Sequence, residues 1–154
     1  MIKINVLVSN KRWKKYIKNP DVYLKKKVKR LGEKNIFFKK KVLEFNLLLS
    51  NESEVKELNR KFRKKNKTTD VLSFPCHEKK KLNKLFEDEK SIFLGDIAIN
   101  LKKILNDSKI KSIKMKLDKL WLHGLLHLLG YRHKTNKDYV IMKRLEIKFF
   151  KIIN

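Results

Sequence analysis

The sequence predicts an α+β fold in which helices pack on a single small mixed sheet. Three observations lead to this prediction. Segments with strand character are interspersed with helical segments, hydrophobic residues make up 42% of the chain and are spread along all of it, and no repeat or linker divides it. Since 154 residues suffice for one domain with its own core, we expect residues 1–154 to form a single domain.

Four segments have the composition of strands. In the first, apolar residues alternate with other residues, and the others are short segments that end at turn residues or at proline. The expected strands are Ile2–Val8, Val42–Leu49, Thr69–Pro75 and Ile92–Asn100. Asp96 lies inside the last of these, which is an unusual place for a carboxylate.

Five segments are expected to be helices that bury one apolar face. They are Val22–Leu31, Ser53–Phe62, Leu101–Ile113, Leu117–Leu129 and Asp138–Ile153. Pro20 favours the start of the first helix, and Gly32 is expected to end it. The segment Lys79–Lys90 is charged and shows no apolar periodicity, so we expect a surface loop there.

Positive charge dominates the composition. Lys and Arg number 41 against 16 Asp and Glu, which gives a formal net charge of +25. Basic clusters are interleaved with apolar residues, so we expect the charge to belong to the folded body and to attract a polyanion. Two other interpretations stay open at this point: a lysine-rich surface without a partner, and binding to an acidic membrane surface.

No segment is expected to cross a membrane. None approaches the roughly 18 apolar residues of a spanning helix, and Ile4–Val8 is too short for the core of a signal peptide. Cys76 is the only cysteine and cannot form an internal disulfide, which agrees with a reducing compartment. We therefore expect a cytoplasmic protein with no membrane or disulfide-linked partner, and Cys76 as a small buried or half-buried side chain.

The strongest chemical signal is a group of histidines at His123, His127 and His133. Two histidines four residues apart lie on one face of a helix, so the first two can direct their rings at one point. Gly130 suits a left-handed helix end that lets the chain turn back and bring His133 to that point. Core histidines are the alternative, but the surrounding leucines offer them no polar partners. Three imidazoles with an open fourth position predict one zinc ion per chain in a catalytic-type site.

The histidine spacing matches the zinc-protease pattern H-E-x-x-H-x-x-G-x-x-H, with one departure. Gly124 stands where the protease has the glutamate that serves as its general base. Peptide hydrolysis would lack its usual proton acceptor, so a zinc metallopeptidase is only an alternative function. Gly124 indicates either bare backbone that admits a substrate beside the metal or a close contact between a helix and a strand.

A second group of residues accompanies the histidines. It comprises Leu58-Asn59, Phe62-Arg63, Thr69–Pro75, Gly95-Asp96-Ile97, and Met142 with Glu146. Together with His123–His133, these residues resemble the YbeY family of bacterial rRNA maturation factors. The family pattern runs L-N-x-x-[YF]-R, T-D-V-L-S-F-P, G-D-I, H-G-x-L-H-L-x-G-Y-D-H and M-x-x-x-E, and the resemblance covers roughly residues 42–150.

The resemblance implies a zinc-dependent endoribonuclease that cuts single-stranded RNA in small-subunit (16S) rRNA maturation and ribosome quality control. It implies ribosomal RNA and the small ribosomal subunit as partners, and it places a family arginine important for activity on Arg63. Neighbouring basic residues are expected to hold the RNA backbone, and exposed aromatic residues to stack on its bases. The candidates for these RNA contacts are Lys61, Lys64, Lys65, Lys67 and Tyr131.

One residue departs from the family pattern. Arg132 stands where the family has an aspartate beside the third histidine. If that aspartate orients a ligand or moves a proton, another group must do so here, and Asp70 and Asp96 are the candidates. Each also has a structural interpretation, as a turn residue or as the partner of a lysine. The departure keeps a non-catalytic, zinc-containing RNA-binding assembly factor as another alternative function.

Overall fold

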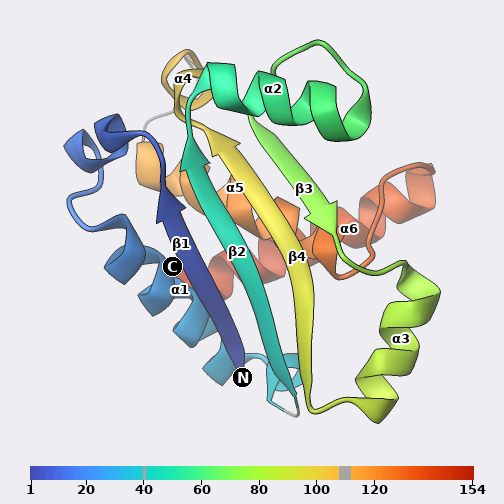
Figure 1. Ribbon diagram of the computed structural model, residues 1–154. Coiled ribbons are helices and arrows are strands. Elements are labelled where there is room, and N and C mark those ends of the chain that lie inside the picture. The colour runs from blue at the N-terminus through green and yellow to red at the C-terminus, as the bar shows by residue number, and fades with distance from the viewer. Residues whose placement is uncertain (40, 108–111) are drawn as a thin grey trace.

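The computed structural model describes residues 1–39, 41–107 and 112–154. Within these residues, four strands form one sheet in the order β1-β2-β4-β3 (Figure 1). The strands are β1 (Ile2–Val8), β2 (Val42–Ser50), β3 (Val71–Pro75) and β4 (Ser91–Asn100). β2 pairs in parallel with β1 and with β4, whereas β3 runs antiparallel to β4. The expected α+β fold with one mixed sheet is therefore confirmed.

Helices lie on both faces of this sheet, but they cover the two faces unequally. They are α1 (Pro20–Lys34), α2 (Glu52–Arg63), α3 (Lys79–Asp88), α4 (Leu101–Leu105), α5 (Ile113–Leu128) and α6 (Asn136–Ile153). Short 3-10 helices lie at Lys11–Lys15 and Ile36–Phe38. Figure 1 shows α1, α5 and α6 behind the sheet and α2 across one end of the opposite face.

The alternation of side chains along the central strands separates two cores. Phe45 of β2 stacks on Trp121 of α5, with ring centroids 6.4 Å apart, and belongs to the large core on the α5 face. On the other face, Ala98 of β4 packs with Val55 of α2 in a small core. Because burial of an aromatic side chain is worth roughly 1.5–3 kcal/mol, the large core holds α5 firmly on the sheet.

A buried carboxylate fixes the first half of α5. Asp118 is fully buried and accepts hydrogen bonds from Tyr23 Oη at 2.9 Å and from Trp121 Nε1 at 3.1 Å. Its second partner in α1 is Lys27, whose Nζ lies 3.3 Å from the carboxylate. Burial and the neighbouring charge of Asp118 raise the pKa of Tyr23, so the phenol stays a hydrogen-bond donor. These bonds set the position of α5 against α1.

The expectation of a surface loop at Lys79–Lys90 is wrong, because residues 79–88 form α3. Its apolar residues Leu82, Leu85 and Phe86 recur at helical spacing, and Leu82 is buried in the large core. The many charged residues of the segment occupy the other faces of the helix. A short amphipathic helix of this kind has too few apolar residues for its periodicity to be recognised among so many lysines.

Several helix ends also differ from expectation. α1 continues past Gly32 to Lys34. Gly32 is needed for packing against β1 and not for ending the helix, because a Cβ there would lie 2.9 Å from Cγ2 of Ile2.

The expected helix Leu101–Ile113 ends early, since α4 stops at Leu105 with Asn106 as its C-cap. Residues 108–111 of that expected helix lie outside the described residues. α5 starts at Ile113 because the side chain of Ser112 caps it, whereas we expected a start at Leu117.

Two further expectations concern exposure. Cys76, expected to be buried or half-buried, is exposed, since it follows the last residue of the edge strand β3. Among the helices that the structure describes, none combines the length and the apolar character needed to cross a membrane.

Candidate metal centre

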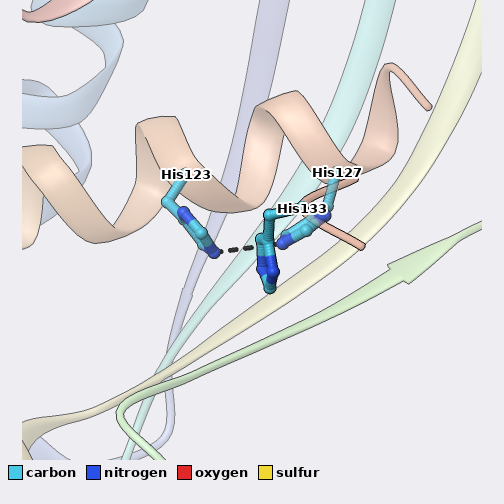
Figure 2. Close-up of side chains that lie close together, drawn as sticks. All are labelled: His123, His127 and His133. Atoms are coloured by element: carbon cyan, nitrogen blue, oxygen red, sulfur yellow. Dashed lines mark hydrogen bonds between the residues drawn. The ribbon is translucent and has the colours of Figure 1, made fainter. Parts of the chain in front are cut away.

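Three histidine side chains converge at the end of α5. His123 and His127 are one helical turn apart on α5, and the helix ends at Leu128. Gly130 has a φ of +84°, the left-handed conformation expected there, and the chain turns back so that His133 faces the other two. One ring nitrogen from each histidine lies within 4.8 Å of the other two (Figure 2). The expected grouping of the three histidines is confirmed.

Each of the two helical histidines is oriented by an oxygen on its Nδ1 side. Nδ1 of His123 lies 2.6 Å from Oε1 of Glu146, and Nδ1 of His127 lies 2.9 Å from the carbonyl oxygen of Tyr131. A carboxylate and a carbonyl only accept hydrogen bonds, so both Nδ1 atoms must carry the proton. In the neutral rings, both Nε2 atoms then present a lone pair.

These lone pairs show that the residues fit a metal ion. The Nε2 atoms of His123 and His127 are 3.0 Å apart, and with both protons on Nδ1 no hydrogen lies between them. Two lone pairs at this distance repel each other unless a cation lies beside both. Two nitrogens bound to one tetrahedral zinc ion at 2.0–2.1 Å would be about 3.3 Å apart, close to the spacing seen. The arrangement can therefore hold a metal ion and leave a coordination position open.

The electrostatics of the centre favour the same protonation states. The pKa of His127 is lowered to about 4, with burial as the largest cause and the neighbouring His123 as the next. For Glu146, burial raises the pKa, but the hydrogen bonds from His123 and Lys143 outweigh it and lower the pKa overall. The imidazole of His127 is thus neutral and the carboxylate of Glu146 ionised at neutral pH, as metal binding requires.

Glu146 is the functional residue that sequence reasoning missed. It lies on α6, and it appeared in the sequence only as part of the M-x-x-x-E pattern, with no role assigned. Asp70 and Asp96, the two expected orienting carboxylates, bond elsewhere. Asp70 accepts from the backbone N–H of Val71, and Asp96 accepts from Nδ2 of Asn46 on the neighbouring strand. In the described residues, the carboxylate that holds a histidine ring of this group is Glu146.

Arg63 ends α2 and reaches the edge strand of the sheet. Its Nη2 donates to the carbonyl oxygen of Ser73 in β3 at 2.7 Å, and its Cζ lies 5.7 Å from the ring centre of Phe74. Among the contacts of the described residues, none joins Arg63 to the three histidines. However, β3 packs against α5, so the strand that Arg63 contacts also borders the helix with His123 and His127.

The expected RNA-contacting lysines surround Arg63 on the surface. Lys61, Lys64, Lys65 and Lys67 are all exposed, which leaves their ammonium groups available to a ligand. Lys64 has a φ of 58° and forms the left-handed C-cap of α2. The backbone carbonyl of Tyr131 accepts from His127, and its half-buried ring has Nζ of Lys79 5.5 Å from the ring centre. Its expected contact with RNA stays a prediction.

Two other residues of the motif have structural explanations. A Cβ at Gly124 would lie 2.9 Å from Cδ1 and from Cγ2 of Ile97 in β4. The close contact between helix and strand therefore accounts for this glycine, and position 124 faces the sheet. Arg132 donates from Nη1 to the carbonyl oxygens of His127 at 2.9 Å and Tyr131 at 3.0 Å. It therefore caps the end of α5.

The fold and the site define the class of the protein: an α+β protein with a three-histidine metal-type centre and a strongly basic surface. The family model described as Endoribonuclease YbeY matches residues 7–154. This chain belongs to the YbeY family. The endoribonuclease YbeY of Pelagibacter ubique is 40% identical to it over 99% of this chain and 97% of that protein. The endoribonuclease YbeY of Ehrlichia canis is 36% identical over 96% and 90%, respectively.

A solved structure agrees with this assignment. The solution structure of TM1509 from Thermotoga maritima matches with a TM-score of 0.60 and 27% sequence identity. The match covers 99% of this chain and 89% of that one. The arrangement of sheet and helices is thus shared with a protein of known structure, and the family is one of nucleases.

Proposed function

We propose that this protein is a zinc-dependent endoribonuclease that cuts single-stranded RNA in the maturation of small-subunit (16S) ribosomal RNA and in ribosome quality control. The observation that supports it most is the pair of facing Nε2 lone pairs on His123 and His127, in a chain of an endoribonuclease family. His133 would supply the third ligand. One zinc ion per chain, a single domain over residues 1–154 and action in the cytoplasm belong to the same proposal.

The protein groups around the centre have distinct roles in this proposal. A bound zinc ion would polarise a phosphate oxygen or lower the pKa of a water molecule to about 7. Arg63 would neutralise negative charge that develops on the phosphate, because a guanidinium can hold two oxygens at once. Glu146 keeps the proton of His123 on Nδ1. Lysines at the end of α2 would hold the RNA backbone: Lys61, Lys64, Lys65 and Lys67.

The close packing of Gly124 against Ile97 speaks against a zinc peptidase. In that class the residue after the first histidine supplies the catalytic carboxylate, and here that position has no side chain and faces β4. Glu146 bonds to His123 and to Lys143. The peptidase alternative therefore has no support at its key position, and a test for protein digestion serves as a specificity control for the cleavage experiment.

The cleavage experiment uses purified full-length protein with one equivalent of zinc and a single-stranded fragment of ribosomal RNA. We expect cleavage by the wild type, about one zinc per chain by elemental analysis, and loss of both in His127→Ala. His77→Ala is the matched control, since His77 is the one histidine outside the group. RNA that is bound but left intact by zinc-loaded protein would contradict the nuclease and favour the assembly factor. Growth of a deletion strain without unprocessed 16S precursor would contradict the role in maturation.

A further inference from the structure

A hollow between α5 and α6 lies directly beside the metal centre. It has a volume of about 260 Å³ and shares Glu146, the carboxylate that holds His123, with that centre. Its apolar floor is formed by Leu122, Ile147 and Phe150, and its rim by the lysines Lys119, Lys143 and Lys151. We call this hollow, defined by these residues and Glu146, the α5–α6 groove. Figure 1 shows the two helices behind the sheet.

The two helices present the groove residues in a regular order. On α6 the residues recur at positions 143, 146, 147, 150 and 151, the spacing of one helix face. On α5, Lys119 lies one turn before His123. Glu146 contacts His123, and Lys119 lies over Phe150, with Nζ 5.6 Å from the ring centre. The two helices therefore run antiparallel. From the contact at Glu146, the groove extends along them by about one helical turn, roughly 5.4 Å, away from the metal centre.

The composition of the groove fits one particular kind of ligand. An apolar floor with an aromatic ring suits the flat face of a nucleobase, and a rim of lysines suits the phosphates on either side of it. Ile147 has 49% of its surface exposed although it is apolar and part of the floor, so contact area is available to a ligand. The carboxylate at the inner end is already engaged by His123 and Lys143, which reduces its repulsion of a phosphate.

We propose that the α5–α6 groove binds one nucleotide of the single-stranded RNA substrate, next to the phosphate at the metal centre. The base lies on Ile147 and on the ring of Phe150, from which the flexible side chain of Lys119 turns away to contact an adjoining phosphate. Lys151 contacts the phosphate on the other side. This inference rests on the proposed function for the identity of the ligand. It adds a base-contacting subsite, built from residues other than those at the basic end of α2, and it makes cleavage depend on an unpaired base.

Charge reversal tests the rim of the groove. The affinity of the metal-free full chain for a fluorescent uridine hexamer is measured, so that cleavage does not intervene. We expect Lys119→Glu with Lys151→Glu to weaken binding about tenfold, with a salt slope lower by about 1.4, or 0.7 for each lost phosphate contact. The matched control is Lys14→Glu with Lys18→Glu, an equal charge change at exposed positions outside the groove. An equal loss in both double variants would overturn the proposal.

Removal of the ring tests the floor. Phe150→Leu should weaken binding of the uridine hexamer at least about fivefold and leave an abasic hexamer unchanged, because base stacking on an aromatic ring is worth about 1 kcal/mol or more. Phe93→Leu, an exposed aromatic residue on β4, is the control. Since Phe150 is partly buried, Ile147→Ser provides a second variant at an exposed position. Equal losses for the two hexamers in both variants would overturn the base contact.

Two further measurements separate this proposal from its alternatives. If the rim variant lost affinity for hexaglutamate as strongly as for the uridine hexamer, the groove would be a site for acidic peptides and the proposal would fail. The proposed nuclease function fails separately: zinc-loaded wild type that leaves RNA intact refutes cleavage, while the affinity comparison still decides the groove. Conversely, the wild type could cleave RNA while the rim variant binds the hexamer as tightly as its control variant does. That result would refute the groove proposal and leave the nuclease function standing.

Discussion

At the scale of single side chains, the metal centre depends on which nitrogen of each imidazole carries its proton. Glu146 and the carbonyl of Tyr131 hold the two Nδ1 protons, and the Nε2 atoms of His123 and His127 are thereby free to bind a metal. Partners of this kind orient the ring and raise the basicity of the ligand nitrogen. The orienting residues should therefore matter nearly as much as the ligands themselves.

Removal of the carboxylate of Glu146 should weaken zinc binding. We expect Glu146→Ala to lower zinc affinity about 10–100-fold, because His123 loses the group that fixes its tautomer. Glu146→Gln should lose less, since its amide oxygen still accepts from Nδ1. Competition with a chromophoric chelator measures the affinity, and Lys143→Ala controls for loss of the neighbouring ion pair. Unchanged affinity in Glu146→Ala would show that the contact is not needed for binding.

Arg63 should act in cleavage more than in folding. We expect Arg63→Ala to keep its zinc and near-normal RNA affinity but to lose about 10²–10³ in cleavage rate, the usual cost of removing a donor to developing charge. Loss of its partly buried hydrogen bond to Ser73 should cost only about 1 kcal/mol of unfolding free energy. Arg63→Lys should restore part of the rate, because it keeps the charge without the planar fork. Single-turnover cleavage measures this, and a wild-type rate in Arg63→Ala would refute the assignment.

The lowered pKa of His127 predicts a pH dependence for the metal-free protein. Its folded pKa is about 4, below the ordinary value near 6.5, so the unfolded chain takes up a proton first as the pH falls. The free energy of unfolding should therefore decrease as the pH falls below about 6.5 toward 4. Urea unfolding at pH 7.5 and 5.5 measures this, and His127→Asn should show a smaller decrease. Equal pH dependence in both proteins would contradict the prediction.

At the scale of the helix, α5 is placed by packing as much as by its own sequence. Gly124 in the helix interior costs about 1 kcal/mol of helix stability relative to alanine. A Cβ at this position, however, would clash with the side chain of Ile97. Asp118 anchors the opposite half of the helix to α1. Because α5 carries both His123 and His127, any shift of α5 against the sheet moves these two histidines too.

A test at this scale is Gly124→Ala. In an isolated helix the substitution would stabilise, but here we expect it to destabilise the protein by about 1–3 kcal/mol through overpacking against β4. In the Ile97→Ala background the same substitution should be neutral or stabilising, because the clashing atoms are gone. Urea unfolding of the two single variants and the double variant measures the coupling. Additive effects would mean that Ile97 does not set the requirement for glycine.

At the scale of the whole molecule, exposed basic residues come from segments far apart in the sequence. The end of α2 contributes one group of exposed lysines, and the α5–α6 groove contributes another. A net charge of +25 extends this potential over the surface and would attract RNA from a distance. With the proposed function, such a distribution would let a small protein hold a flexible strand at more than one phosphate.

Salt should therefore control RNA binding. We expect log affinity of the metal-free protein for a uridine oligomer to fall linearly with log salt, by about 0.7 for each phosphate contact. Duplex RNA of equal length should bind less tightly, because its bases are not available for stacking. Titrations between low and physiological salt measure both effects. A flat salt response would show that the positive charge has no part in RNA binding.

Features that depend on local spacing could be predicted from the amino-acid sequence. The i,i+4 interval of His123 and His127 and the left-handed turn at Gly130 predicted the grouping of ligands, and period-two and period-three-to-four patterns predicted the strands and most helices. Helix α3 was not predicted because its apolar stripe is short. The end of α1 was predicted wrongly because Gly32 allows close packing on β1 and does not end the helix.

The groups that complete the site are brought together by contacts between distant elements. Glu146 is 23 residues from His123 and meets it because α6 packs against α5, which no local pattern encodes. The same packing creates the α5–α6 groove, and contact with β4 explains Gly124. Local spacing is a property of the chain alone, whereas these contacts follow from the way buried surfaces of distant elements fit together, and that fit is settled only when the whole core has formed.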